Sequence, residues 1–240
     1  MPGWDNFLTE QDKAHQEVRG KRELNGFGET PCVLAIDDYY SVLGLEREPI
    51  LESIKTWPMS CGLEGWEAID KTAELIASAR ESNIPVIYVH SLEGFPSPWA
   101  GRRGGGGSYL DKLPYEMRIK ANEIVAEIEP QPGELVIQKA APSAFKGTPL
   151  LFHLNYEGID TIITAGETTS GCVRASVVDG ATARFRMGVV EECCFDRTQA
   201  SHWMNLFDLH QKYADVIDRF YAADYFKSVA AKSKVPAGVA

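Results

Sequence analysis

Cys172 has the setting of a nucleophile. It ends the segment Gly-Glu-Thr-Thr-Ser-Gly-Cys172, which follows an apolar run at the point where a helix is expected to begin. A helix N-terminus carries partial positive charge and free N–H groups, so we expect it to lower the pKa of the Cys172 thiol and to hold a developing oxyanion. Position alone also fits a small apolar residue buried in a strand-to-helix turn, which is the commoner case. The other four cysteines lack this setting and are expected to be structural.

Three charged residues follow other apolar runs, at points where strands are expected to end: Asp37, Lys139 and Arg197. An acid such as Asp37 can cap a helix or act as a general base. Lys139 is either a solvated loop lysine or, if it lies near Asp37 and the thiol, a charge that lowers both of their pKa values. Arg197 could bind a substrate carboxylate through two N–H groups, or form an ion pair with Asp196 or another neighbour.

Weaker features concern anions and metals. Arg102 and Arg103 precede four glycines, but this segment follows no strand and has no phosphate-loop spacing. We expect a lid there, with both arginines as candidate substrate contacts. His90 follows the second strand with no second ligand at metal-binding spacing, so we predict no metal. His202 and His210 are expected at the surface or at an interface.

The elements that must position these residues alternate between short β-branched runs and helical patterns. Strands are expected at 33–36, 85–89, 135–137, 162–165, 188–190 and 214–217, and helices at 65–81, 116–128, 149–158, 173–181 and 201–212. This alternation predicts an α/β fold of three layers, with helices on both faces of a six-stranded, mostly parallel, Rossmann-like sheet. Ligands bind at the carboxyl ends of such strands, so Asp37, Lys139 and Cys172 should converge on one edge.

Composition limits the class of protein. The chain has 240 residues, of which 44% are hydrophobic and 24% charged, which excludes general disorder and suits one large domain. We predict a polar N-terminal arm over 1–31, a single domain over 32–228 and a C-terminal tail over 229–240. No apolar run reaches the roughly 20 residues of a membrane span, and the first residues do not resemble a signal peptide.

Charge and cysteine usage indicate partners and location. The formal net charge of −10 argues against nucleic acid as a partner, because an acidic surface repels phosphates. Five cysteines form no disulfide framework, so we expect reduced thiols in a cytoplasmic protein.

Three segments, taken together, resemble the isochorismatase-like cysteine hydrolases. They are VLAID with Asp37, VIQKAAPSAFKGTPL with Lys139, and TIITAGETTSGCVRASVVDG with Cys172, and the resemblance covers about residues 25–220. Within that superfamily, Thr-Ser-Gly-Cys-Val-Arg and the Asp196-Arg197 pair are most similar to the branch of N-carbamoylsarcosine amidases and maleamate amidohydrolases. The resemblance implies a catalytic triad of Asp37, Lys139 and Cys172.

The same resemblance implies further site residues. A cis peptide is expected between Glu167 and Thr168, with the N–H groups of Thr168 and Cys172 as the oxyanion hole and Arg197 as the carboxylate-binding residue. Metal-dependent relatives carry an Asp/His set near the second strand, where this chain offers only His90. The resemblance therefore implies an enzyme without a metal or other cofactor.

The implied activity is hydrolysis of the terminal C–N bond of a small, carboxylate-bearing amide or ureide, with release of ammonia through a thioester. Relatives that cleave isochorismate lack the cysteine, so that chemistry is disfavoured. A hydrolase of neutral amides or ureides, and a non-catalytic small-molecule-binding member of the fold, remain alternatives. By resemblance, a homodimer or homotetramer is expected.

Overall fold

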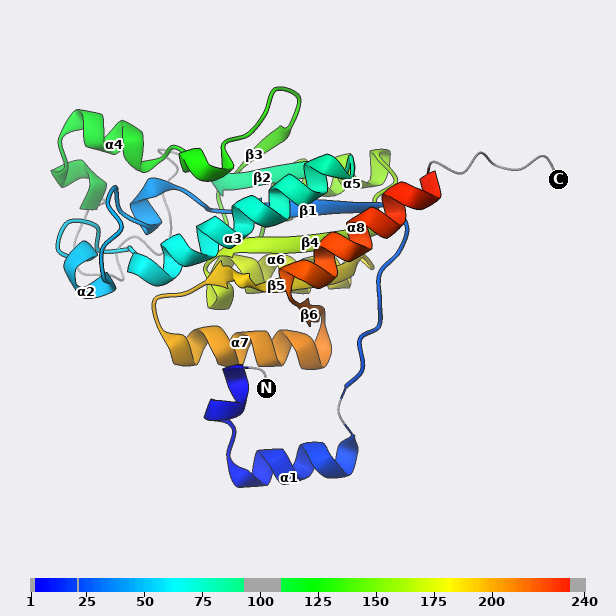
Figure 1. Cartoon of the computed structure of the whole chain (residues 1–240). Coiled ribbons are helices and arrows are strands. Elements are labelled where there is room, and N and C mark those ends of the chain that lie inside the picture. The colour runs from blue at the N-terminus through cyan, green and yellow to red at the C-terminus, as the bar shows by residue number, and fades with distance from the viewer. Residues whose placement is uncertain (1–2, 21, 93–108, 234–240) are drawn as a thin grey trace.

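A six-stranded sheet forms the centre of the molecule (Figure 1). The structure, a computed structural model, describes residues 3–20, 22–92 and 109–233. The strands are β1 (Pro31–Ile36), β2 (Val86–Ser91), β3 (Leu135–Lys139), β4 (Thr161–Glu167), β5 (Arg186–Phe195) and β6 (Asp215–Ile217). They lie in the order β3-β2-β1-β4-β5-β6, and every pairing is parallel. The predicted α/β class is confirmed.

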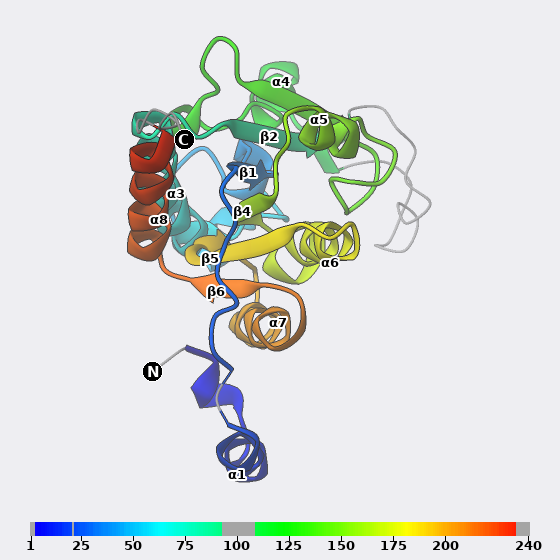
Figure 2. The ribbon, with the colours of Figure 1, turned by 90° about the vertical axis from the view of Figure 1, so that its right-hand side faces the viewer.

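Helices cover both faces of this sheet. The helices of the described residues are α1 (Glu10–Arg19), α2 (Ile50–Ser53), α3 (Gly62–Glu81), α4 (Tyr115–Ala121), α5 (Leu150–Tyr156), α6 (Arg174–Thr182), α7 (Gln199–Lys212) and α8 (Arg219–Ser233). Shorter turns are η1 (Gly3–Phe7), η2 (Tyr40–Val42), η4 (Tyr109–Lys112), η5 (Ala126–Ile128) and the wider η6 (Thr169–Val173). Figure 2 shows α3 and α8 on one face and α5, α6 and α7 on the other, which are the outer layers that the alternating pattern predicts. No helix in the described ranges is long and apolar enough to cross a membrane.

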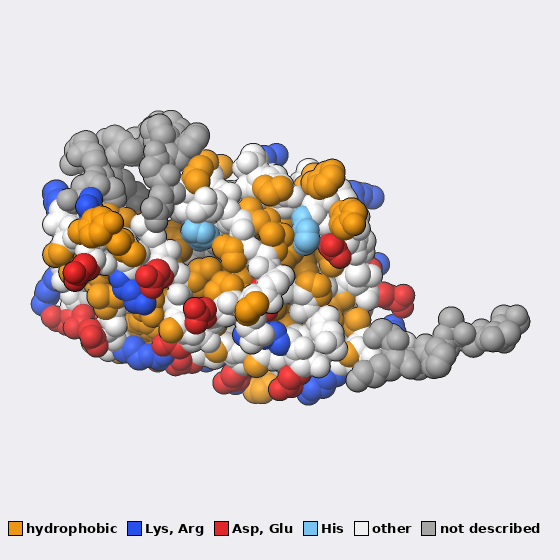
Figure 3. All heavy atoms as spheres, turned by 90° about the horizontal axis from the view of Figure 1, so that it is seen from above, with side chains coloured by type: hydrophobic (Ala, Val, Ile, Leu, Met, Phe, Trp, Pro, Cys, Tyr) orange, Lys and Arg blue, Asp and Glu red, His pale blue; other side chains and the backbone are white. Residues whose placement is uncertain are grey.

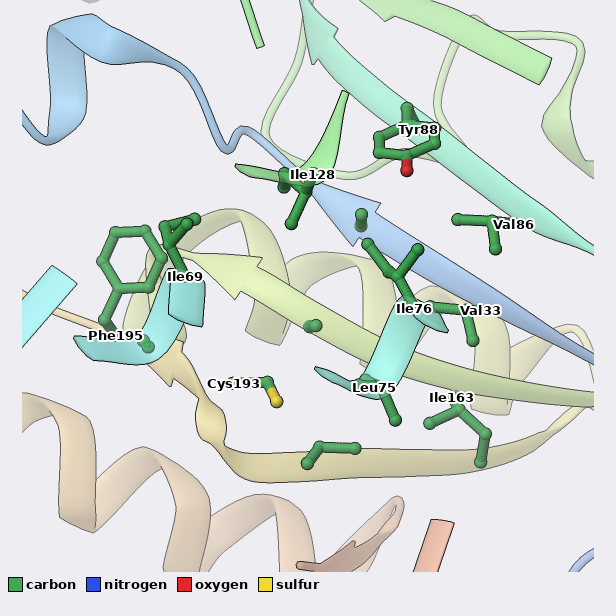
Figure 4. Close-up of a cluster of buried hydrophobic side chains, with 14 of the residues drawn as sticks. Val33, Ile69, Leu75, Ile76, Val86, Tyr88, Ile128, Ile163, Cys193 and Phe195 are labelled. Carbon is green, nitrogen blue, oxygen red and sulfur yellow. The ribbon is translucent and has the colours of Figure 1, made fainter. Parts of the chain in front are cut away.

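The central strands are buried along their whole length because both of their faces are covered. Every residue of β1 and β4 is buried, as expected for parallel strands between two helical layers. Successive side chains of β1 enter opposite cores, Val33 on the α3 side and Leu34 on the other. Figure 4 shows the first core, where Val33 and Ile163 of the sheet lie with Ile69 and Ile76 of α3.

The chain changes direction across the sheet between β1 and β4. From β1 it continues to β2 and β3 on one side, and from β4 to β5 and β6 on the other. In open α/β sheets such a point leaves a crevice at the carboxyl ends of the strands. Gly166 of β4 pairs there with Ile36 of β1, and a Cβ on Gly166 would lie 2.1 Å from the Ile36 carbonyl oxygen. The two strands can therefore approach this closely only because residue 166 is glycine.

The predicted helix over 116–128 is shorter than expected. It ends at Ala121, because the backbone that follows is bound by the segment after β1. The Tyr40 N–H donates to the Glu123 carbonyl oxygen at 3.2 Å, and the Val125 N–H donates to the Asp38 carbonyl oxygen at 3.1 Å. These long-range hydrogen bonds replace helical ones.

Both ends of the described chain are better anchored than the sequence predicts. The predicted tail from 229 begins inside α8, which runs to Ser233 and packs Val229 against the core. In the predicted polar arm, Trp4 is buried and stacks on His210 at 5.6 Å between ring centroids. Arg22 forms an ion pair with Asp215 of β6 at 3.3 Å.

Candidate active site

Three residues predicted from the sequence meet at the carboxyl edge of the sheet. Asp37 follows β1, Lys139 ends β3, and Cys172 lies in the turn η6 after β4. Lys139 Nζ lies 2.7 Å from Asp37 Oδ2 and donates to Cys172 Sγ at 3.3 Å. The side chains of Asp37 and Lys139 are almost fully buried, whereas Cys172 is partly exposed. An acid, an ammonium group and a thiol are thus in direct contact.

Local backbone structure directs these side chains. Asp37 adopts a left-handed conformation with φ 59°, which is uncommon outside glycine and turns the chain immediately after the strand. Its N–H still donates to the Val89 carbonyl oxygen of β2 at 2.8 Å, so the turn is held by the sheet. Ser176 of α6 links the turn that carries Cys172 to the segment after β3. Its hydroxyl donates to the Cys172 carbonyl oxygen at 2.7 Å and accepts from the Ala144 N–H at 2.9 Å.

Burial and mutual charge shift the pKa values of Asp37 and Lys139. Burial raises the pKa of Asp37, and the Lys139 ammonium group offsets this only in part. For Lys139, burial lowers the pKa, but the neighbouring Asp37 and Cys172 outweigh it and the net pKa is raised. The ammonium group is therefore charged, and the raised pKa of Asp37 makes it a stronger base than an exposed carboxylate.

The expected lowering of the thiol pKa is wrong for the free protein. Burial, and then the Asp37 carboxylate, raise the pKa of Cys172 to about 12 against the opposing effect of Lys139. The helix begins only at Arg174, two residues beyond the cysteine, and loss of solvent around the sulfur is the largest effect on its pKa. Cys172 rests as a neutral thiol, so any nucleophilic attack requires proton transfer to a neighbouring base.

The turn that carries Cys172 is tightly held. The N–H groups of Gly171 and Val173 both donate to the Thr168 carbonyl oxygen, at 2.8 and 3.2 Å. The Glu167–Thr168 peptide bond is cis. The Ser170 N–H donates to Asp196 Oδ2 at 2.9 Å, which attaches the turn to the segment after β5.

His202 supports the same turn from α7. Its Nδ1 lies 2.8 Å from Thr169 Oγ1, and burial lowers the pKa of His202 to about 4, so the ring is neutral. The expectation of a surface or interface position is wrong for His202, which is buried in the chain. His210 is half-buried, and its Nδ1 accepts a hydrogen bond from the Val216 N–H at 3.3 Å.

Arg197 is engaged by the protein itself. Its Nη2 lies 3.1 Å from Glu167 Oε2, its Nη1 donates to Thr168 Oγ1 at 3.1 Å, and its Nε donates to the Met59 carbonyl oxygen at 2.6 Å. The partner of its charge is thus Glu167 rather than Asp196, whose Oδ1 accepts from the Arg197 backbone N–H. Burial raises the pKa of Glu167 to about 7, although Arg197 opposes that shift.

The remaining predictions concern two candidate arginines and a metal site. Arg102 and Arg103 lie outside the described residues. Within the parts of the chain that the structure describes, no three His, Cys, Asp or Glu side chains are grouped to hold a metal ion. Sequence analysis missed Glu167 as the partner of Arg197. The available signal was an acid at the end of the otherwise apolar run before Thr168.

Comparison with known proteins shows what this chain is similar to. A family model described as the isochorismatase domain matches residues 64–219. A maleamate amidohydrolase of Pseudomonas putida is 37% identical, covering 90% of this chain and 95% of its own. An N-carbamoylsarcosine amidase of an Arthrobacter species is 32% identical, covering 82% of this chain and 72% of its own. The solved structure of N-carbamoylsarcosine amidase from Thermoplasma acidophilum shares the fold, with a TM-score of 0.62 at 23% identity over 79% of this chain and 96% of that one. The chain belongs to the isochorismatase family.

Proposed function

We propose that the protein is a cysteine amidohydrolase that cleaves the terminal C–N bond of a small, carboxylate-bearing amide or ureide. The contact of Asp37, Lys139 and Cys172 carries this proposal, because it joins a nucleophile to a base and a charged hydrogen-bond donor. Relatives named maleamate amidohydrolase and N-carbamoylsarcosine amidase support the choice of substrate class.

In the first half of the reaction, Asp37 takes the thiol proton of Cys172 as the sulfur attacks the substrate carbonyl carbon. One oxygen of Asp37, Oδ1, is buried with no hydrogen-bond partner among the described residues and is therefore available to accept the proton. Charge on the carbonyl oxygen is stabilised by the N–H groups of Thr168 and Cys172, a contribution worth about 10²–10³ in rate for one donor elsewhere. The C–N bond then breaks, Asp37 returns the proton to nitrogen, and ammonia leaves.

In the second half, water hydrolyses the thioester. Asp37 removes a proton from the water molecule as its oxygen attacks the acyl carbon, the C–S bond breaks, and the proton returns to the Cys172 sulfur. Lys139 stays charged throughout and stabilises both the carboxylate and the departing thiolate. A carbamoyl substrate gives a carbamate, which decomposes to carbon dioxide and an amine.

An ammonia-release assay tests this function. Maleamate and N-carbamoylsarcosine should be hydrolysed in preference to nicotinamide, and Cys172→Ala should lower the rate by at least about 10³-fold. Cys32→Ala is the matched control, since Cys32 lies at the opposite end of β1 and should leave the reaction intact. Full activity of Cys172→Ala contradicts the mechanism. Intact mass of acid-quenched wild type during turnover should reveal an acyl adduct.

One observation favours the alternative of a neutral substrate. Arg197, the group expected to bind a substrate carboxylate, already faces the buried carboxyl group of Glu167. A preference for the neutral diamide maleamide over maleamate at every pH would support that alternative.

A further inference from the structure

Glu167 already contacts Arg197, the residue to which the proposed function assigns the substrate carboxylate. Its side chain is only 7% exposed, and Oε2 receives the Thr168 hydroxyl while lying 3.1 Å from Arg197 Nη2. The Arg197 side chain is 24% exposed, although Nη2, the atom that faces Glu167, is itself buried. In the free protein, Glu167 and Thr168 both contact the Arg197 guanidinium group.

The titratable groups around Glu167 leave Arg197 as the cation that faces its carboxyl group. The titratable groups that act on it or feel its charge come from the ends of β1 and β5, the segment before α3, and η6. They are Asp37, Asp38, Tyr39, Cys61, Cys172 and Arg197. Arg197 is the cation among them, and the charge of Asp37 is balanced by Lys139. A second carboxylate beside Glu167 would therefore share one guanidinium group in a buried, low-dielectric site.

Two carboxylates in such a site cannot both stay ionised without a large cost, so one of them gains a proton. A free substrate carboxylate is a stronger acid than an enclosed glutamic acid side chain. The raised pKa of Glu167, about 7, indicates which of the two accepts the proton. Once protonated, Glu167 has an O–H that can donate to the incoming carboxylate.

We propose that Glu167 is a specificity-determining residue, which neutralises Arg197 in the free protein and takes up one proton from solvent when Arg197 binds a substrate carboxylate. This inference rests on the proposed function, because it takes the substrate to be anionic. It makes the affinity for anionic amides depend on pH, whereas the affinity for neutral amides does not.

Calorimetric titration of maleamate into the Cys172→Ala protein, which should not turn it over, tests the inference. At pH 8, in two buffers of different protonation enthalpy, close to one proton should be taken up per maleamate bound. Between pH 8 and pH 9 the Kd should rise by nearly tenfold, because each unit above the Glu167 pKa removes most of the remaining protonated form. Maleamide, the uncharged diamide, should show neither effect.

The Cys172→Ala/Glu167→Gln protein should bind maleamate with no proton uptake and a flat Kd, about tenfold tighter than its parent at pH 8. Glu157→Gln, the same change at an exposed position after α5, is the matched control. Maleamate binding without proton uptake by the Cys172→Ala protein overturns the inference, and so does absence of binding. Both of these contradicting results come from the Cys172→Ala protein, so the test holds even if the Glu167→Gln variant does not fold.

The two proposals fail in different ways. If wild type releases ammonia from maleamate while binding shows no proton linkage, the role of Glu167 is wrong and the amidohydrolase function stands. If maleamate binds with proton uptake but wild type releases no ammonia, the proposed function is wrong and the role of Glu167 stands.

Discussion

Asp38 is a buried carboxyl group without a partner. Neither of its side-chain oxygens has a hydrogen-bond partner among the described residues. Burial, and then the charges of Asp37 and Glu167, raise the pKa of Asp38 well above its ordinary value. The folded protein therefore holds Asp38 protonated at pH values where the unfolded chain releases that proton.

This proton makes stability fall as pH rises. Above about pH 4 the folded state binds more protons at residue 38 than the unfolded state, so this group lowers the free energy of unfolding as the pH rises, by at most about 1.4 kcal/mol per pH unit. Asp38→Asn removes the titration, so the stability of the variant relative to wild type should grow as the pH rises from 5 to 7. Urea denaturation at three pH values measures this difference in stability, and Asp224→Asn, at an exposed position of α8, is the control. A pH-independent difference contradicts the assignment.

At the scale of elements, the pairing of β1 with β4 determines whether the site residues meet. Gly166 has φ 113°, in the region that favours glycine, and lies against the Ile36 backbone just before Asp37. A side chain here must separate the two strand ends that carry Asp37 and Cys172.

Gly166→Ala should therefore lower kcat/KM by about 100-fold or more, since a displacement of 1 Å at a reacting centre has an effect of that size. Initial rates of ammonia release, with denaturation to confirm folding, measure the loss. Gly158→Ala is the matched control, because it has φ 66° but nothing within 4 Å of an added Cβ. Its backbone strain should cost about 1 kcal/mol of stability and little activity. Equal activity losses in the two variants would argue against a displaced site.

The sequence predicts the parts of this arrangement that depend on local pattern. Apolar runs indicate six strands, and Asp37, Lys139 and Cys172 stand out in the segments that follow three of these runs before any contact is known. The pairing of Arg197 with Glu167 depends on how two strand ends face each other, and local spacing does not encode that. Likewise, the helix after Pro114 ends early because a distant segment binds its backbone. The position of Cys172 near a helix N-terminus predicts a lowered pKa for its thiol, whereas burial raises that pKa.

At the scale of the whole molecule, the β3 edge of the sheet carries exposed apolar side chains. Figure 3 views this side, and hydrophobic side chains gather there among charged ones. The elements at this edge expose Tyr115, Ile119, Val136, Phe152 and Tyr156. Exposed apolar clusters of this kind mark interaction surfaces.

We expect the protein to form a homodimer or homotetramer. Light scattering should give a multiple of the 26.5 kDa chain mass, and replacing Phe152 and Tyr156 of α5 by serine should shift the mass toward the monomer. Leu51→Ser, an exposed apolar residue of α2, is the control and should leave the mass unchanged. A monomer at high protein concentration contradicts the expectation.

The strand order divides the sheet into two halves, each consecutive in the chain, and the only strand pairing between the halves is that of β1 with β4. Asp37 and Lys139 belong to the first half, and Cys172 and Arg197 to the second. A chain still emerging from the ribosome, or one truncated before β4, therefore carries the base and the ammonium group without a thiol to activate. In the proposed mechanism the base and the thiol come together only when the two halves of the sheet join, so catalytic activity would require the complete sheet.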